Sequence, residues 1–77
     1  MPSAYVLINC DLGYEDQIIN ELEKLTGVDY ATGLDGAYDI IAKVNAESTE
    51  KLKEIIMLHV KKIDKIQSMT TLIVIED

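Results

Sequence analysis

Residues 28–44 read VDYATGLDGAYDIIAKV, and this stretch decides the fold. Two runs rich in β-forming residues, Val28 to Leu34 and Ala37 to Val44, flank the dipeptide Asp35-Gly36. Asp-Gly is favoured in tight hairpins because glycine accepts a positive φ angle. The stretch therefore predicts two antiparallel strands joined directly by a tight turn.

The residues before this hairpin predict one strand and one helix. Ala4 to Asn9 is rich in β-forming side chains and ends at the turn-like segment 11–13. From Tyr14 to Leu25, apolar residues recur at helical spacing between charged ones, and Gly27 follows as a stop signal. We expect an amphipathic helix here.

The residues after the hairpin repeat the same order. Ser48 is a candidate N-cap for a helix from Thr49 to Lys62, and Ile66 to Ile75 predicts a fourth strand. The apolar stripe of this helix is Leu52, Ile55, Ile56, His59, Val60 and Ile63. The order βαββαβ predicts an α+β, ferredoxin-like fold, with a four-stranded antiparallel sheet and both helices on one face.

The predicted strands do not alternate cleanly between apolar and polar residues. Segments 5–8, 38–42 and 72–75 place apolar side chains on both faces of the sheet. A second copy of the chain is the simplest cover for the face without helices, which predicts a dimer. Met57 and Leu58 lie beside the helix stripe and are either contacts between dimers or scattered surface residues.

Composition excludes several classes of function. With 14 acidic residues against 7 basic ones, the net charge is −7, which disfavours direct binding to nucleic acid. No apolar run reaches the length of a membrane span, and no signal peptide is recognisable at the N-terminus. A lone Cys10 agrees with a reducing compartment. We expect one domain over residues 1–77, located in the cytoplasm.

A few residues are candidates for catalysis, metal binding or ligand binding. His59 lies on the apolar stripe, so a structural role is favoured over acid/base chemistry, and one histidine is too little for a metal site. Asp39 sits just inside a β-rich run, where a carboxylate either binds a ligand's ammonium group or makes a structural pair. The hydroxyls of Ser68, Thr70 and Thr71 are compatible with strand structure alone. No cofactor is expected.

The whole chain resembles the C-terminal domain of the leucine-responsive/asparagine-synthetase (Lrp/AsnC) regulators, the regulation of amino-acid metabolism domain. The stretches Ala4–Ile8, Gly36–Val44 and Ile66–Val74 carry the resemblance, above all the Gly-x-Tyr-Asp pattern of the hairpin. It implies a non-catalytic module without the family's helix-turn-helix. It also implies sheet-to-sheet dimers of the dimeric α+β barrel type, joined into rings of four or five dimers that bind amino acids between neighbouring dimers.

By position, the resemblance places Gly36, Tyr38, Asp39, Met69 and Thr71 in the effector pocket. Thr71 matches the family's usual threonine, whereas Met69 replaces a small hydroxyl residue common there. The leading hypothesis is an amino-acid sensor that acts through partners. The alternatives are a structural partner that co-assembles with full-length regulators without binding a ligand, and a small enzyme that uses His59.

Overall fold

The computed structural model describes residues 2–75, and its elements follow the predicted βαββαβ order. Met1 and residues 76–77 lie outside the described part. The strands are β1 (Ser3–Cys10), β2 (Val28–Gly33), β3 (Ile40–Asn45) and β4 (Ile66–Val74). The helices are α1 (Glu15–Glu23), α2 (Thr49–Ile55) and the π-helix η1 (Ile56–Val60), which continues α2. The α+β, ferredoxin-like prediction is confirmed.

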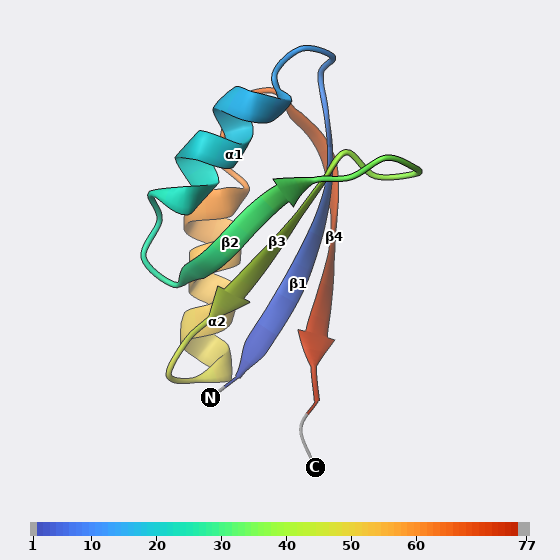
Figure 1. Ribbon diagram of the computed structural model, residues 1–77. Helices are drawn as coiled ribbons and strands as arrows, with labels where there is room; N and C mark the ends of the chain where they lie inside the picture. Colours follow the sequence, from blue (N-terminus) through green and yellow to red (C-terminus); the bar gives the residue numbers. More distant parts are fainter. Residues whose placement is uncertain (1, 76–77) are drawn as a thin grey trace.

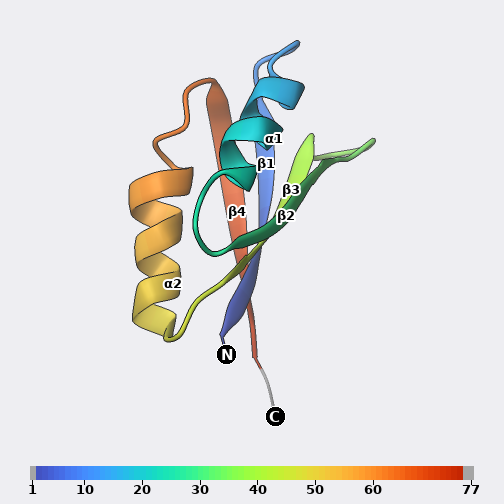
Figure 2. The ribbon, with the colours of Figure 1, turned by 60° about the vertical axis from the view of Figure 1, so that its left-hand side comes forward.

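The strands form one antiparallel sheet in the order β2-β3-β1-β4, and α1 and α2 cover one of its faces (Figures 1 and 2). The face under the helices carries the core, because alternate residues of β1 and β3 point toward α1 and α2. The fully buried side chains of this core are Ala4, Val6, Ile8, Ile18, Leu22, Ile40, Ala42, Val44, Leu52 and Val60. β4 lies at the sheet edge beside β1.

The tight turn predicted at Asp35-Gly36 is wrong. β3 begins at Ile40 rather than at Ala37, and residues 34–39 form a wider loop that projects from the sheet on the side away from the helices (Figures 1 and 2). The backbone N–H of Leu34 donates to the carbonyl of Asp39 at 2.8 Å, which closes the base of the loop. We refer to residues 34–39 as the hairpin arm.

The second helix also departs from its prediction. It changes after Ile55 from an α-helix to the π-helix η1, in which the N–H of Lys61 donates to the carbonyl of Ile56, five residues earlier, at 2.9 Å. The wider turn shifts the helical phase. Val60 is therefore fully buried, whereas His59 is exposed and does not lie on the buried stripe as predicted.

Candidate functional site

Asp39 links the hairpin arm to β1. Its backbone N–H donates to the carbonyl of Ile8 at 2.9 Å, and its carboxylate Oδ2 accepts the backbone N–H of Cys10 at 2.9 Å. The regular pairing of β1 with β3 ends at Ile8, so the carboxylate supplies the acceptor that the strand no longer offers. Asp39 thus has a structural pairing role, one of the two alternatives drawn from the sequence.

Tyr38 belongs to the same arm, and its side chain reaches β4 at the edge of the sheet. Its hydroxyl lies 3.3 Å from Oγ1 of Thr70 in β4, and either atom can donate. Thr70 pairs with Leu7 of β1, which lies between the buried residues Val6 and Ile8 and therefore points to the opposite face of the sheet. The contact therefore lies on the face of the sheet that the helices leave bare.

Met69 and Thr71 point the other way. In the register of β4 with β1, Met69 faces Ile8 and Thr71 faces Val6, both of which are buried under the helices. Thr70, which pairs with Leu7, and Ser68, which pairs with Asn9, occupy the strand positions that alternate with that of Thr71. Met69 is partly buried and packs against the core, while Thr71 is exposed at the sheet edge.

A hollow of about 530 Å³ opens beside these two residues, between η1 and β4. A second hollow of about 300 Å³ continues it along β4 toward α2. The two share Met57 and Thr71, so they form one groove, which we call the β4 groove. Its lining residues are Lys53, Ile56, Met57, Lys61, Ile66, Gln67, Ser68, Met69, Thr71 and Ile73.

The five predicted pocket residues therefore fall into two groups. Gly36, Tyr38 and Asp39 belong to the hairpin arm; the Tyr38 hydroxyl reaches Thr70 on the face away from the helices, and the Asp39 carboxylate binds the N–H of Cys10 at the end of β1. Met69 and Thr71 line the β4 groove, on the helix side. The structure brings Met69 and Thr71 together in one hollow. Tyr38 contacts Thr70 rather than either of these two residues.

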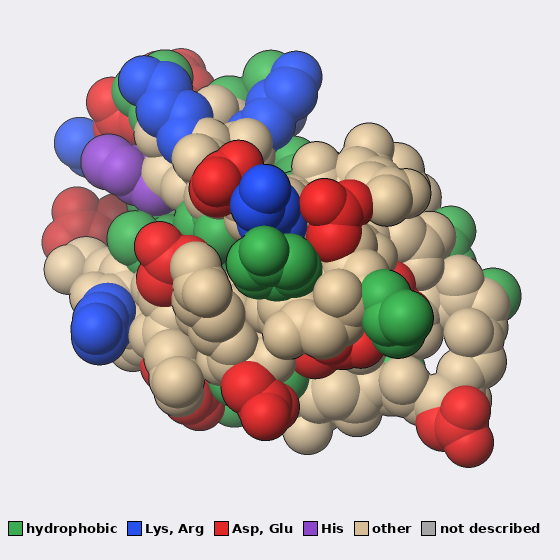
Figure 3. Space-filling model, turned by 90° about the horizontal axis from the view of Figure 1, so that it is seen from above, with side chains coloured by type: hydrophobic (Ala, Val, Ile, Leu, Met, Phe, Trp, Pro, Cys, Tyr) green, Lys and Arg blue, Asp and Glu red, His purple; other side chains and the backbone are tan. Residues whose placement is uncertain are grey.

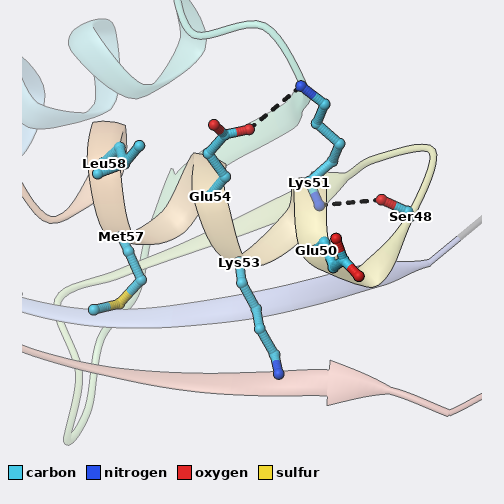
Figure 4. A pocket seen from close by; sticks show the side chains of 7 residues that line it. All are labelled: Ser48, Glu50, Lys51, Lys53, Glu54, Met57 and Leu58. Atoms are coloured by element: carbon cyan, nitrogen blue, oxygen red, sulfur yellow. Dashed lines mark hydrogen bonds and ion pairs between the residues drawn. The ribbon is translucent and has the colours of Figure 1, made fainter.

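Sequence reasoning missed Met57 and Lys61 as lining residues of the groove. Their positions depend on the π-helical turn, and no periodicity in the sequence signals that turn. Figure 4 shows Met57 and Lys53 directed toward the strands, whereas Leu58 and Glu54 lie on the outer side of the helix. A further hollow of about 550 Å³ lies beside the 3.4 Å ion pair of Lys51 with Glu54, and it shares Met57 and Lys53 with the β4 groove.

The bare sheet face is apolar, as the continuous apolar runs predicted. We call it the outer face; it presents Tyr5, Leu7, Tyr30, Ile41 and Leu72, which pair across the strands with one another or with Lys43. Tyr30 and Leu72 are 40% and 50% exposed. Large apolar side chains on one sheet face form the kind of patch that marks an interaction surface.

Cys10 is a buried thiol at the end of β1, next to a register shift between β1 and β4. Burial raises the pKa of this thiol, and the nearby carboxylates of Asp39, Glu15 and Asp11 raise it further. A protonated thiol is a poor nucleophile, so the environment agrees with a structural role.

The charged side chains of the described residues form neither a metal site nor, in the view of Figure 3, a continuous basic surface. Among residues 2–75, no three His, Cys, Asp or Glu side chains are placed to hold a metal ion. In Figure 3, acidic side chains are spread across the view, and the lysines lie mainly on the side of the histidine. None of the described helices is long and apolar enough to cross a membrane.

Comparisons with solved structures support this arrangement of strands and helices. A hypothetical protein from Pyrococcus horikoshii is similar at a TM-score of 0.93 and 28% identity, covering 100% of this chain and 93% of its own. A protein from Thermus thermophilus shares the fold at a TM-score of 0.93 and 21% identity, with 100% and 96% covered.

AsnC of E. coli is similar at a TM-score of 0.89 and 28% identity, over 99% of this chain and 52% of AsnC. A comparison with curated proteins found no match. The model of the Lrp/AsnC ligand binding domain matches residues 3–77. The chain therefore belongs to the Lrp/AsnC ligand-binding domain family, whose members are regulatory ligand-binding modules.

Proposed function

We propose that residues 1–77 form a non-catalytic module that binds an amino acid between copies of the chain and acts through partners in the regulation of transcription or amino-acid metabolism. The observation that carries this proposal is the division of the pocket residues. Asp39 and Tyr38 lie on the arm, whereas Met69 and Thr71 lie in the β4 groove, which no residue of the arm lines within one chain. A neighbouring copy can bring an arm to a groove.

The chemistry of the two parts is complementary. The arm offers the carboxylate of Asp39, which already accepts the backbone N–H of Cys10 through Oδ2, as a partner for an ammonium group. The groove offers the Thr71 hydroxyl, the ammonium group of Lys61 and apolar side chains. Together they supply the few polar groups and the apolar lining that small-molecule sites use.

Assembly begins, in this proposal, with the outer face. Two copies that pack their outer faces together bury Leu72, Tyr30 and the apolar residues between them, and a two-fold axis makes the contact self-complementary. The arm projects from the sheet on the side away from the helices (Figure 2), and in the proposed dimer it extends past the contact between the two sheets. The arm of one dimer then contacts the β4 groove of the next dimer, and repetition of this contact gives a ring of four or five dimers.

A subunit-mixing experiment tests where the pocket forms. The variants Asp39→Asn and Thr71→Val each damage one part, so each assembly by itself is expected to lose amino-acid binding in isothermal titration calorimetry. If the two are unfolded together and refolded as mixed rings, about a quarter of the sites at random mixing regain an intact arm and an intact groove from different chains. Binding that stays absent from confirmed mixed rings contradicts a pocket shared between copies.

The second candidate is a structural partner that co-assembles with full-length regulators and binds no ligand. Met69 favours it, because a large side chain replaces the small hydroxyl residue common at this position and occupies part of the groove. Native mass spectrometry of the chain mixed with full-length regulators from the same cell tests this role. Mixed rings together with silent titrations support it, and failure to mix excludes it.

A further inference from the structure

The π-helical turn brings His59 to a hollow that the proposed function does not use. His59 is exposed on η1, and it lines a hollow of about 450 Å³ between the helix and the loop that follows α1. π-helical turns frequently occur at functional sites, and a hollow of this volume accommodates a small molecule. We call it the α1–α2 hollow; its lining residues are Lys24, Leu25, Thr26, Lys51, Glu54, Ile55 and His59.

Two ammonium groups and one imidazole, each from a different element, line this hollow. Lys24 follows the end of α1, Lys51 belongs to α2, and His59 belongs to η1. Of the lining residues, Glu54 is the one that carries a negative charge. The hollow is thus locally positive in a chain whose net charge is −7. Local charge of this sign attracts a small anion, whereas the acidic remainder of the chain repels an extended polyanion such as nucleic acid.

The ion pair of Lys51 with Glu54 leaves Lys51 available to a ligand. Nζ and Oε2 lie 3.4 Å apart, and the two side chains are 66% and 48% exposed. Exposed pairs of this kind are weak, because water and salt screen them. In Figure 4, the Lys51 side chain extends from α2 toward the loop after α1, and the loop residue Thr26 lines the same hollow. Its ammonium group can therefore turn to a bound anion at low cost.

The remaining lining residues favour a phosphate group attached to an organic part. Thr26 supplies a hydroxyl, and hydroxyl, ammonium and imidazole groups are all donors to phosphate oxygens. Leu25 and Ile55 are half-buried and pack against the core, so they offer an apolar wall. The loop lies close to this wall, since a Cβ atom at Gly27 would be 2.8 Å from Cδ1 of Ile55. That close packing fixes the spacing between the loop and α2.

We propose that the α1–α2 hollow binds the phosphate group of a small organic molecule, with Lys24, Lys51 and His59 as its partners. This site is separate from the amino-acid site of the proposed function, because the hollow shares no lining residue with the β4 groove. It also lies on the helix side of the sheet, so contact between two outer faces leaves it open.

Proton NMR of the intact oligomer tests the site, because His59 is the sole histidine and its imidazole C–H signals report on the hollow directly. Inorganic phosphate, phenyl phosphate, acetate and chloride are the probes, at constant pH and ionic strength. Both phosphates are expected to shift the His59 signals to saturation. Phenyl phosphate should bind about threefold or more tightly than inorganic phosphate, since its ring contacts the apolar wall. Acetate and chloride should give no saturation.

Three variants locate the bound anion. Lys24→Gln is expected to weaken phosphate binding about tenfold, the scale of one hydrogen bond to a charged group. Glu54→Gln removes the competing carboxylate and should tighten binding about two- to fivefold. Lys62→Gln is the matched control, because it removes the same charge from an exposed position that does not line the hollow. Its affinity should stay within about twofold, because salt screens exposed charges.

Circular dichroism and native mass spectrometry verify that each variant is folded and assembled. His59 signals that do not saturate with either phosphate probe overturn the site. Acetate that binds as tightly as the phosphates overturns the preference for phosphate, and phenyl phosphate that binds more weakly than inorganic phosphate overturns the organic part. Equal losses in Lys24→Gln and Lys62→Gln would show that overall charge attracts the anion, and would overturn its location in the hollow.

Discussion

At the scale of single residues, Gly27 is the position where the backbone demands glycine most strongly. Its φ angle is +97°, and a Cβ atom there would lie 2.8 Å from Cδ1 of Ile55 and 2.9 Å from the carbonyl oxygen of Asn45. The contact with Asn45 is to backbone, which cannot move without disturbing the end of β3. Gly27 therefore allows the loop after α1 to pass close to both β3 and α2.

Replacement of Gly27 by alanine is expected to lower the free energy of unfolding by about 3 kcal/mol, the sum of left-handed strain and the close contact. Gly13→Ala is the control, since Gly13 has a φ angle of +90° but nothing within 4 Å of its would-be Cβ. The free energy of unfolding of Gly13→Ala should fall by only about 1 kcal/mol, because this variant suffers the backbone strain without a close contact. Urea denaturation at one protein concentration measures both, and equal losses would contradict the packing argument.

Asp39 has a structural role and a proposed role in ligand binding, and two substitutions separate them. Asp39→Ala leaves the N–H of Cys10 without its acceptor and is expected to lower the free energy of unfolding by about 1–2 kcal/mol. Asp39→Asn keeps an oxygen acceptor, so its stability should stay within about 0.5 kcal/mol of the unmodified protein. The neutral amide should nevertheless abolish amino-acid binding. An Asn variant that binds normally would assign Asp39 to structure only.

At the scale of elements, the start of α2 depends on a local cap. Ser48 has extended backbone angles, and its Oγ accepts the N–H of Lys51 at 3.1 Å, as its position before the helix predicted. Ser48→Ala is expected to lower the free energy of unfolding by about 1 kcal/mol, whereas Ser48→Asp should retain the stability. Thermal and urea denaturation compare the two variants; an alanine variant as stable as the original would show that the cap is dispensable.

The order of elements was predictable because each one carries its own periodicity. The spacing of Ile18 and Leu22 marked the buried side of α1, and both are fully buried. His59 was misplaced because a π-helical turn shifts the phase of the helix without changing the pattern of residue types. The turn was predicted too short because Asp39 was assigned to the strand, whereas β3 begins at Ile40 and the Asp39 carboxylate binds the N–H of Cys10 instead.

The candidate site was predictable only as a set of residues. Position and resemblance pointed to Tyr38, Asp39, Met69 and Thr71, but within one chain the two arm residues do not line the groove that holds Met69 and Thr71. Lys61 and Met57 were not foreseen, since their placement follows from η1. The sequence of one chain does not indicate which side chains a neighbouring copy contributes to a shared site.

At the scale of the whole molecule, the outer face is proposed to hold the dimer together. Leu72 lies on this face opposite Tyr5 and is 50% exposed. Leu72→Lys would bury two like charges near the two-fold axis and is expected to convert dimers to monomers. Leu12→Lys is the control, because Leu12 is 92% exposed in the loop before α1. Sedimentation velocity compares the two, and a Leu72→Lys dimer would exclude this face.

We propose that copies of this chain assemble so that arm and groove together bind an amino acid. Native mass spectrometry of the purified protein, first without and then with a pool of amino acids, tests it most directly. The account predicts a ring of dimers that gains the mass of an amino acid, in a number that matches the arm-to-groove contacts. A monomer, or a ring whose mass is unchanged by every amino acid in the pool, would contradict it.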